Sequence, residues 1–208
     1  HGSPGDWSAW DNIITHDSIV SSYYVLAADR AGYGLTTEKP QNELIQQASV
    51  IETALVQLGI HTNITVVGHS YGAAVAQQLM LNNPQNYALG IFVAGTLSPK
   101  LMEPRWYNKL ASLSIINAIM PKDLSASNYE MIGLPEALKK NEKDLNSITT
   151  PIVFIQGEDD VLVPFETADY YKKHKKEGVE YVLLEGVNHF IPWTDPNIIT
   201  DILIKQKR

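Results

Sequence analysis

Three residues of this chain have the types and the order that nucleophilic catalysis by a serine requires. Ser70 lies at the centre of a G-x-S-x-G pentapeptide, Gly68–Gly72. A serine hydroxyl is a weak nucleophile at neutral pH, so it needs a base within hydrogen-bond reach and an acid that orients the base. Asp160 and His189 follow Ser70 in the order serine, acid, histidine. We therefore predict Ser70 as nucleophile, His189 as base and Asp160 as acid, with Asp159 as the alternative acid.

The backbone around the serine predicts a site for a developing negative charge. An apolar run precedes Gly68–Gly72 and a run of small residues follows it, so the pentapeptide should form a sharp turn between a strand and a helix. The N–H of Tyr71 would then point at an oxyanion, and the turn Gly2-Ser3 offers the Ser3 N–H as a second donor. The alternative is a nucleotide-binding turn, which is disfavoured because the chain has no G-x-G-x-x-G and no lysine at the required place.

The alternation of apolar and amphipathic segments predicts an α/β fold, with a mostly parallel sheet covered by helices on both faces. We expect strands at residues 23–28, 64–67, 89–94, 151–156 and 181–184, and helices at residues 7–14, 43–58, 71–82, 165–175 and 195–207. Ser70, Asp160 and His189 each follow a predicted strand. They should therefore meet at the carboxyl edge of the sheet, where sites of open α/β sheets gather.

Residues 98–146 break this alternation and predict an inserted helical cap. The segment is too long for a simple crossover between two parallel strands. We expect residues 1–97 and 147–208 to form the core, and the cap to lie over the strand ends. The alternative is a packed helical excursion without a role in substrate binding. Four prolines are expected to cut the segment into short helices: Pro99, Pro104, Pro121 and Pro135.

Large apolar side chains of the cap suggest an apolar pocket for the acyl or alcohol part of a substrate. The candidates are Trp106, Tyr107 and Met131, together with Val161 beside the predicted acid. This prediction rests on composition alone.

Composition limits the other classes of function. The 208 residues suit one domain, and the net charge of −7, from 16 basic and 23 acidic residues, argues against nucleic acid as a partner. The dense positive cluster Lys172–Lys176 falls at a predicted helix end, where cations are favourable. The chain has no cysteine, which excludes a disulfide framework and a thiolate metal site. No run is apolar enough to span a membrane, and no metal or organic cofactor is implied.

The first residues, His1–Gly5, form a glycine-rich turn without an initiator methionine. Such a turn normally follows a strand or helix, so we expect the natural protein to be longer and to have upstream strands. No signal peptide is visible. We take a cytoplasmic location as the default and leave open a signal peptide in an upstream segment. The sequence does not indicate an oligomeric state.

These motifs together make the chain similar to the α/β-hydrolase superfamily, in its serine-nucleophile, esterase-like branch with a small cap and with the N-terminus truncated. The matching stretches follow the family's order along the chain: His1–Gly5, Asp29–Gly34, Gly68–Gly72, Gly157–Pro164 and Asn188–Phe190. The resemblance implies that His1–Gly5 is the oxyanion loop. It also favours Asp160 over Asp159, because the family's acid usually lies three residues after the glycine and four before the proline.

The resemblance also bears on the reaction. The loop H-G-x-P is shared with epoxide hydrolases and haloalkane dehalogenases, but those use an aspartate in the elbow, so Ser70 argues against both activities. Proline iminopeptidases usually carry a second glycine after H-G and a larger cap, which argues against a peptidase. The expected function is a serine hydrolase of small carboxylic esters or related acyl compounds, acting on a small-molecule substrate without a cofactor.

Two alternatives stay open at this point. The same three residues could serve carbon–carbon bond hydrolysis, thioester hydrolysis, perhydrolysis or acyl transfer. A protein of another class, which binds a ligand in the pocket and turns it over slowly or not at all, is the second alternative.

Overall fold

A parallel β-sheet lies at the centre of the molecule, as predicted from the apolar runs. The computed structural model describes residues 1–207, and its sheet has four strands in the order β1-β2-β3-β4. The strands are β1 (Ile64–His69), β2 (Tyr87–Val93), β3 (Ile152–Gly157) and β4 (Val179–Leu184). All three neighbouring pairs are parallel. The inner strands β2 and β3 are almost fully buried, which explains why they consist of continuous apolar residues rather than alternating ones.

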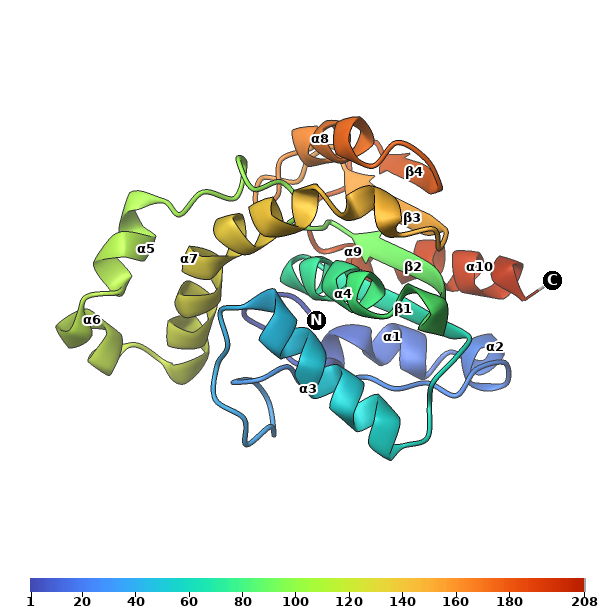
Figure 1. Ribbon diagram of the computed structural model, residues 1–208, viewed down its shortest axis with the longest axis horizontal. Coiled ribbons are helices and arrows are strands. Elements are labelled where there is room, and N and C mark those ends of the chain that lie inside the picture. Colours follow the sequence, from blue (N-terminus) through green and yellow to red (C-terminus); the bar gives the residue numbers. More distant parts are fainter. Residues whose placement is uncertain (208) are drawn as a thin grey trace.

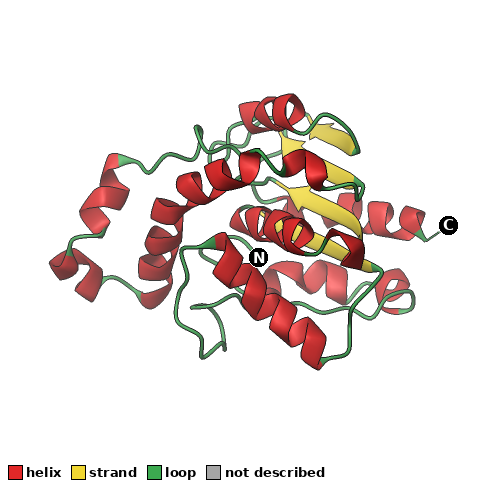
Figure 2. Ribbon diagram, in the orientation of Figure 1, coloured by secondary structure: helices red, strands yellow, loops and turns green. Residues whose placement is uncertain are grey.

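Helices cover both faces of this sheet, as Figure 2 shows. The helices that flank the sheet are α1 (Asp11–Ile14), α2 (Asp17–Val20), α3 (Leu44–Gln57), α4 (Tyr71–Asn82), α8 (Glu166–His174), α9 (Ile191–Thr194) and α10 (Pro196–Gln206). Short 3-10 helices lie at Trp7–Trp10, Pro84–Asn86 and Leu145–Ser147.

Two apolar layers hold the sheet between the helices. One layer packs α1, α2 and α10 against β2 and β3 through Ile13, Ile19 and Leu203. The other packs α3, α4 and α8 against the opposite face, with Phe92 and Phe154 of the sheet at its centre. Each face is thereby removed from water, which is the main stabilising contribution in such a fold.

Residues 23–28 do not form the strand predicted for them. Their side chains alternate, with Tyr23, Val25 and Ala27 packed on the core and Tyr24 and Leu26 exposed. The segment is therefore extended, but within residues 1–207 it has no ladder partner, since β1 is hydrogen-bonded only to β2. A period of two predicts an extended backbone, whereas a strand also requires a neighbour that the local pattern does not specify.

Residues after β2 form the region predicted as a cap. Its helices are α5 (Trp106–Ala111), α6 (Ser114–Ile119) and α7 (Lys122–Glu142), and Figure 1 shows α5 and α6 standing away from the sheet. Pro135 does not end a helix, contrary to expectation: it lies inside α7, which is 21 residues long. The buried residues Leu134 and Leu138 pack on the core and offset the hydrogen bond that the proline removes. The division into core and cap remains a prediction.

Candidate active site

Ser70 occupies a strained turn between β1 and α4. Its φ of 54° and ψ of −120° lie where non-glycine residues rarely occur, and it is the N-cap of α4. The flanking glycines permit this turn. A Cβ on Gly68 would lie 2.3 Å from the Gly72 carbonyl oxygen, and one on Gly72 would lie 2.6 Å from the His1 carbonyl oxygen. Only glycine fits at either position without displacing the backbone.

Backbone hydrogen bonds tie this turn to the sheet. The Ser70 N–H donates to the Val93 carbonyl at 2.9 Å, and the Ser70 carbonyl accepts from the Thr96 N–H at 3.2 Å. The Tyr71 N–H belongs to the first turn of α4, where N–H groups have no acceptor within the helix. A role of this donor in binding an oxyanion stays a prediction.

Asp160 and His189 lie together in the loops that follow β3 and β4. His189 Nδ1 donates to Asp160 Oδ2 at 2.7 Å, and both side chains are buried. The carboxylate accepts the proton on Nδ1, so neutral His189 carries its free lone pair on Nε2. Glu158 and Asp159, the other carboxylates of this loop, are exposed.

Three further donors hold the Asp160 carboxylate. The N–H groups of Leu162 and Val163 donate to Oδ1 at 2.9 and 2.7 Å, and Gln156 Nε2 donates to Oδ2 at 3.1 Å. A buried carboxylate with this many donors is fixed in orientation. No local pattern in the sequence singles out Gln156.

His69 connects the serine turn to the histidine loop. Its Nε2–H donates to the His189 carbonyl at 2.9 Å, and the two rings lie 4.8 Å apart between centroids. Burial, with the neighbouring His189 as a second cause, lowers the pKa of His69 to about 3, so this ring is neutral. Because His69 directly precedes Ser70, this bond brings the loop of His189 to the nucleophile turn. The sequence analysis gave His69 no role.

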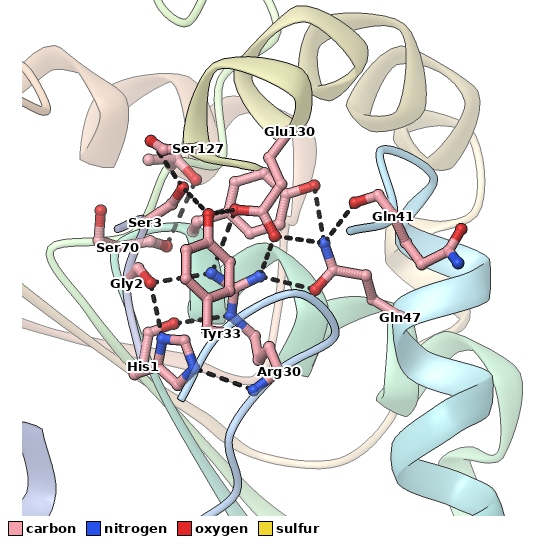
Figure 3. A network of polar contacts seen from close by, with 12 residues as sticks. His1, Gly2, Ser3, Arg30, Tyr33, Gln41, Gln47, Ser70, Ser127 and Glu130 are labelled. Atoms are coloured by element: carbon pink, nitrogen blue, oxygen red, sulfur yellow. Dashed lines mark hydrogen bonds and ion pairs between the residues drawn. The ribbon is translucent and has the colours of Figure 1, made fainter. Parts of the chain in front are cut away.

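The loop His1–Gly5, called the oxyanion loop below, lies against the serine turn. A Cβ on Gly2 would be 3.1 Å from the Ser70 Cβ and 3.1 Å from His69 Nδ1. The Ser3 Oγ donates to the Ser127 Oγ of α7 at 2.9 Å and lies 3.0 Å from the Tyr33 hydroxyl oxygen. Figure 3 shows this loop between Ser70 and a cluster of buried polar side chains.

The residues predicted for a substrate pocket are spread over three elements. Trp106 and Tyr107 lie on α5, pack edge to face and are exposed, Trp106 at 75 %. Met131 lies on α7 and packs on the core, and Val161, beside Asp160, is 82 % exposed. Two surface cavities of about 550 and 540 Å³ are lined by residues of α3, α4, α7 and α8, and none of the three predicted catalytic residues lines them. A role of the four residues in substrate binding stays a prediction.

Within residues 1–207, no three histidine, aspartate or glutamate side chains are grouped so that they could hold a metal ion. Over the same range, every helix is too short or too polar to cross a membrane.

This chain is similar to known proteins in sequence and in fold. The model of a family described as "Alpha/beta hydrolase family" matches residues 1–200. The Mesoderm-specific transcript homolog protein of Bos taurus is 33 % identical over 94 % of this chain and 73 % of its own length.

Solved structures share the fold at lower identity. An esterase (EaEST) from Exiguobacterium antarcticum superposes with a TM-score of 0.76 at 20 % identity, covering 99 % of this chain and 89 % of the esterase. Epoxide hydrolase CorEH superposes with a TM-score of 0.75 at 18 % identity, covering 99 % and 88 %. One fold thus carries an esterase and an epoxide hydrolase, so the reaction has to be argued from the residues of the site.

Proposed function

The chain belongs to the alpha/beta hydrolase family, and from that premise we propose that it is a serine hydrolase of small carboxylic esters or related acyl compounds. The hydrogen bond between buried Asp160 and His189 Nδ1, next to the strained turn of Ser70, carries the proposal. It leaves His189 Nε2 as the atom that can accept a proton, on the side of the ring away from the acid.

In the proposed reaction, Ser70 Oγ attacks the ester carbonyl while His189 Nε2 takes the hydroxyl proton. The carbonyl oxygen becomes an oxyanion, which accepts hydrogen bonds from the N–H groups of Ser3 and Tyr71. The bond from carbon to the alcohol oxygen then breaks, and the alcohol leaves with the proton from His189. Water repeats these steps on the acyl-serine, releases the acid and restores Ser70.

Asp160 has a separate part in this scheme. Its carboxylate keeps the proton of neutral His189 on Nδ1, and its charge stabilises the imidazolium that forms after proton transfer. Because Asp160 is itself fixed by Gln156 and two backbone N–H groups, the ring of His189 needs little reorganisation during the reaction.

A panel of p-nitrophenyl esters of increasing acyl length tests the proposal. We expect turnover by the unaltered protein and a fall in kcat of about a thousandfold or more in Ser70→Ala and His189→Ala. Ser18→Ala, which removes an exposed hydroxyl on α2, is the matched control and should keep full activity. Turnover that survives Ser70→Ala would overturn the proposal.

A further inference from the structure

We propose that Glu130 of α7 is a positioning residue, which acts through Arg30 to fix the direction of the Ser3 N–H in the oxyanion loop. This inference rests on the proposed function, because it assigns Ser3 to the binding of the oxyanion. It adds that α7, the helix leading from α5 and α6 back to the core strand β3, governs the oxyanion donor.

The Arg30 side chain donates hydrogen bonds to two successive residues of the oxyanion loop. Its Nη2 donates to the Gly2 carbonyl at 2.8 Å, and its Nε donates to the His1 carbonyl at 3.0 Å. Its backbone N–H donates to the ring of His1 at 3.0 Å. Figure 3 shows the guanidinium lying beside this loop, with the bonds to both carbonyls drawn. The Gly2 carbonyl also accepts a hydrogen bond from Nδ1 of the His1 ring at 2.8 Å, so the rigid fork of Arg30 and one bond within the loop hold it together.

Because of peptide geometry, the hydrogen bond from Arg30 to the Gly2 carbonyl also fixes the direction of the Ser3 N–H. The Gly2 carbonyl and the Ser3 N–H belong to the same planar peptide unit, in which C=O and N–H point in opposite directions when the bond is trans. A hydrogen bond that fixes the Gly2 carbonyl therefore fixes the Ser3 N–H as well. Rotation of this unit would turn the donor away from a developing oxyanion without moving Ser70.

Glu130 in turn fixes Arg30. The two side chains form a two-pronged ion pair, in which Arg30 Nη1 donates to Oε1 and Nη2 donates to Oε2 at 3.2 Å. Arg30 is 3 % exposed and Glu130 is 0 % exposed, so neither charge is compensated by water. Gln47 bonds to both partners, and Tyr33 donates its hydroxyl to Glu130 Oε2 at 2.8 Å. Burial, followed by the charge of Glu130, raises the pKa of Tyr33, which keeps that hydroxyl protonated.

A second contact of α7 reaches the same loop. Ser127 lies one helical turn before Glu130 and accepts a hydrogen bond from the Ser3 side chain at 2.9 Å. The helix therefore meets Ser3 through Ser127 and the preceding carbonyl through Glu130 and Arg30. A displacement of this part of α7 would move both contacts together.

The choice of charged groups supports a role in orientation. A pair of apolar side chains of similar volume would stabilise this interior at least as well, because burying two charges carries a desolvation cost. What the ion pair adds is direction, since each N–H of Arg30 points at a defined acceptor. Among these acceptors are the carbonyls of the oxyanion loop, which the directed N–H groups of Arg30 hold in one orientation.

A misdirected donor should act on the transition state rather than on the bound substrate. The oxyanion exists only after attack by Ser70, so kcat should fall while KM stays nearly constant. Complete loss of one such donor lowers turnover by about 10²- to 10³-fold, so partial misdirection is expected to cost about 10- to 100-fold. The pH at which activity is half-maximal should not move, because Asp160 and His189 are untouched.

Glu130→Gln is the first test, because it keeps the shape of the side chain and removes its charge. Glu136→Gln is the matched control on the same helix, where the carboxylate is 79 % exposed and pairs with Lys140. We would measure kcat and KM on a p-nitrophenyl ester, and the affinity of a boronic acid that forms a tetrahedral adduct with Ser70. Glu130→Gln should lower kcat and weaken boronate binding by a similar factor with KM within about twofold, and Glu136→Gln should change none of these.

Arg30→Lys is the second test, and it decides the matter if Glu130→Gln fails to fold. It keeps a cation for Glu130, but a single ammonium cannot hold the Gly2 and His1 carbonyls as the guanidinium does. We expect the same fall in kcat, with activity expressed per Ser70 titrated so that unfolded protein is not counted.

If a folded Glu130→Gln or Arg30→Lys variant keeps the kcat and the boronate affinity of the unaltered protein, the inference is overturned and the proposed function still stands. A fall in apparent kcat that merely tracks the folded fraction, with the boronate affinity of the folded protein unchanged, would overturn it too. If the unaltered protein neither hydrolyses esters nor binds the boronate, the proposed function fails first, and the inference fails with it.

Discussion

Asp160 accepts hydrogen bonds from His189, Gln156 and two backbone N–H groups, and these donors fix the orientation of its carboxylate. With the carboxylate fixed, His189 can carry its proton on Nδ1 and present Nε2 as a base. The exposed neighbours Glu158 and Asp159 lack such donors from the sheet and could not hold a ring in one orientation. The chemistry that we propose for the site therefore depends on one carboxylate of the three.

His69 leads to a prediction about stability and pH. Its pKa of about 3 in the folded protein lies below the ordinary value near 6.5, so unfolding takes up a proton between these two values. The folded state should therefore lose stability as pH falls through this range, by on the order of 2 kcal/mol between pH 7 and pH 5. Urea unfolding at both pH values measures this, and His69→Gln should lack this part of the pH dependence.

His61→Gln is the control for that prediction, since His61 is exposed in the turn before β1. It should leave the difference between pH 7 and pH 5 as in the unaltered protein. If His69→Gln keeps the full pH dependence, then His69 does not stay neutral through burial.

For individual residues, the sequence predicts those that stand in a recognisable local pattern. Ser70 lies between glycines after an apolar run, and His189 and Asp160 follow strands in a fixed order. The structure brings Asp160 and His189 into contact, whereas their catalytic roles are still to be tested. Arg30 and Glu130 are different, because 100 residues separate them and nothing local marks a polar residue that will be buried. Such pairs emerge only from tertiary packing.

At the level of helices and strands, glycines determine the junction between β1 and α4. Gly68 lets the strand end close to the first turn of the helix, and this approach supports the strained φ of Ser70. Gly59 has another purpose. It follows α3 with a φ of 71° and open space around it, so it serves backbone conformation alone.

Gly68→Ala should destabilise the fold strongly. Its Cβ would lie 2.3 Å from a backbone oxygen of Gly72, which cannot move aside as a flexible side chain could. We expect a loss of about 3 kcal/mol or more in the free energy of unfolding. Gly59→Asn is the control and should cost no more than about 1 kcal/mol, because asparagine tolerates the left-handed region. Equal losses in the two variants would show that the close approach at Gly68 is not what limits the turn.

The anchoring of α7 gives a second prediction for the elements. Leu134 is fully buried in the core layer that contains α4, although it lies within the region predicted as a cap. Leu134→Ala should lower the free energy of unfolding by about 2 to 5 kcal/mol through the cavity it leaves. Ile115→Ala on α6, where the side chain is 83 % exposed, should change it by less than about 0.5 kcal/mol. Similar values in a denaturation experiment would mean that α7 is not anchored in the core.

Apolar periodicity was sufficient to predict the elements that carry the site. The three strands that precede Ser70, Asp160 and His189, and the helices α3, α4, α8 and α10, lie within a few residues of their expected places. The two errors have physical causes. Residues 23–28 have the alternation of a strand but no neighbour to pair with, and Pro135 is tolerated because core packing holds α7 on both sides of it.

The whole molecule brings distant segments to one edge of its sheet. Parallel strands end on the same side, so the loops after β1, β3 and β4 deliver Ser70, Asp160 and His189 to that side. The oxyanion loop and α7 reach the same region, where Ser3 contacts Ser127 and Gly2 lies against Ser70. The arrangement depends on the alpha/beta hydrolase fold as a whole, and the reaction depends on which side chains stand at that edge.

Labelling with a fluorophosphonate tests the central claim most directly, because it detects an activated serine without any assumption about the substrate. Peptide mass spectrometry should locate the adduct on Ser70 of the folded protein. His189→Ala should abolish the adduct, and Asp160→Asn should slow its formation by on the order of 10⁴-fold. A folded protein that takes up no label on Ser70, or whose label is indifferent to His189, would contradict the account.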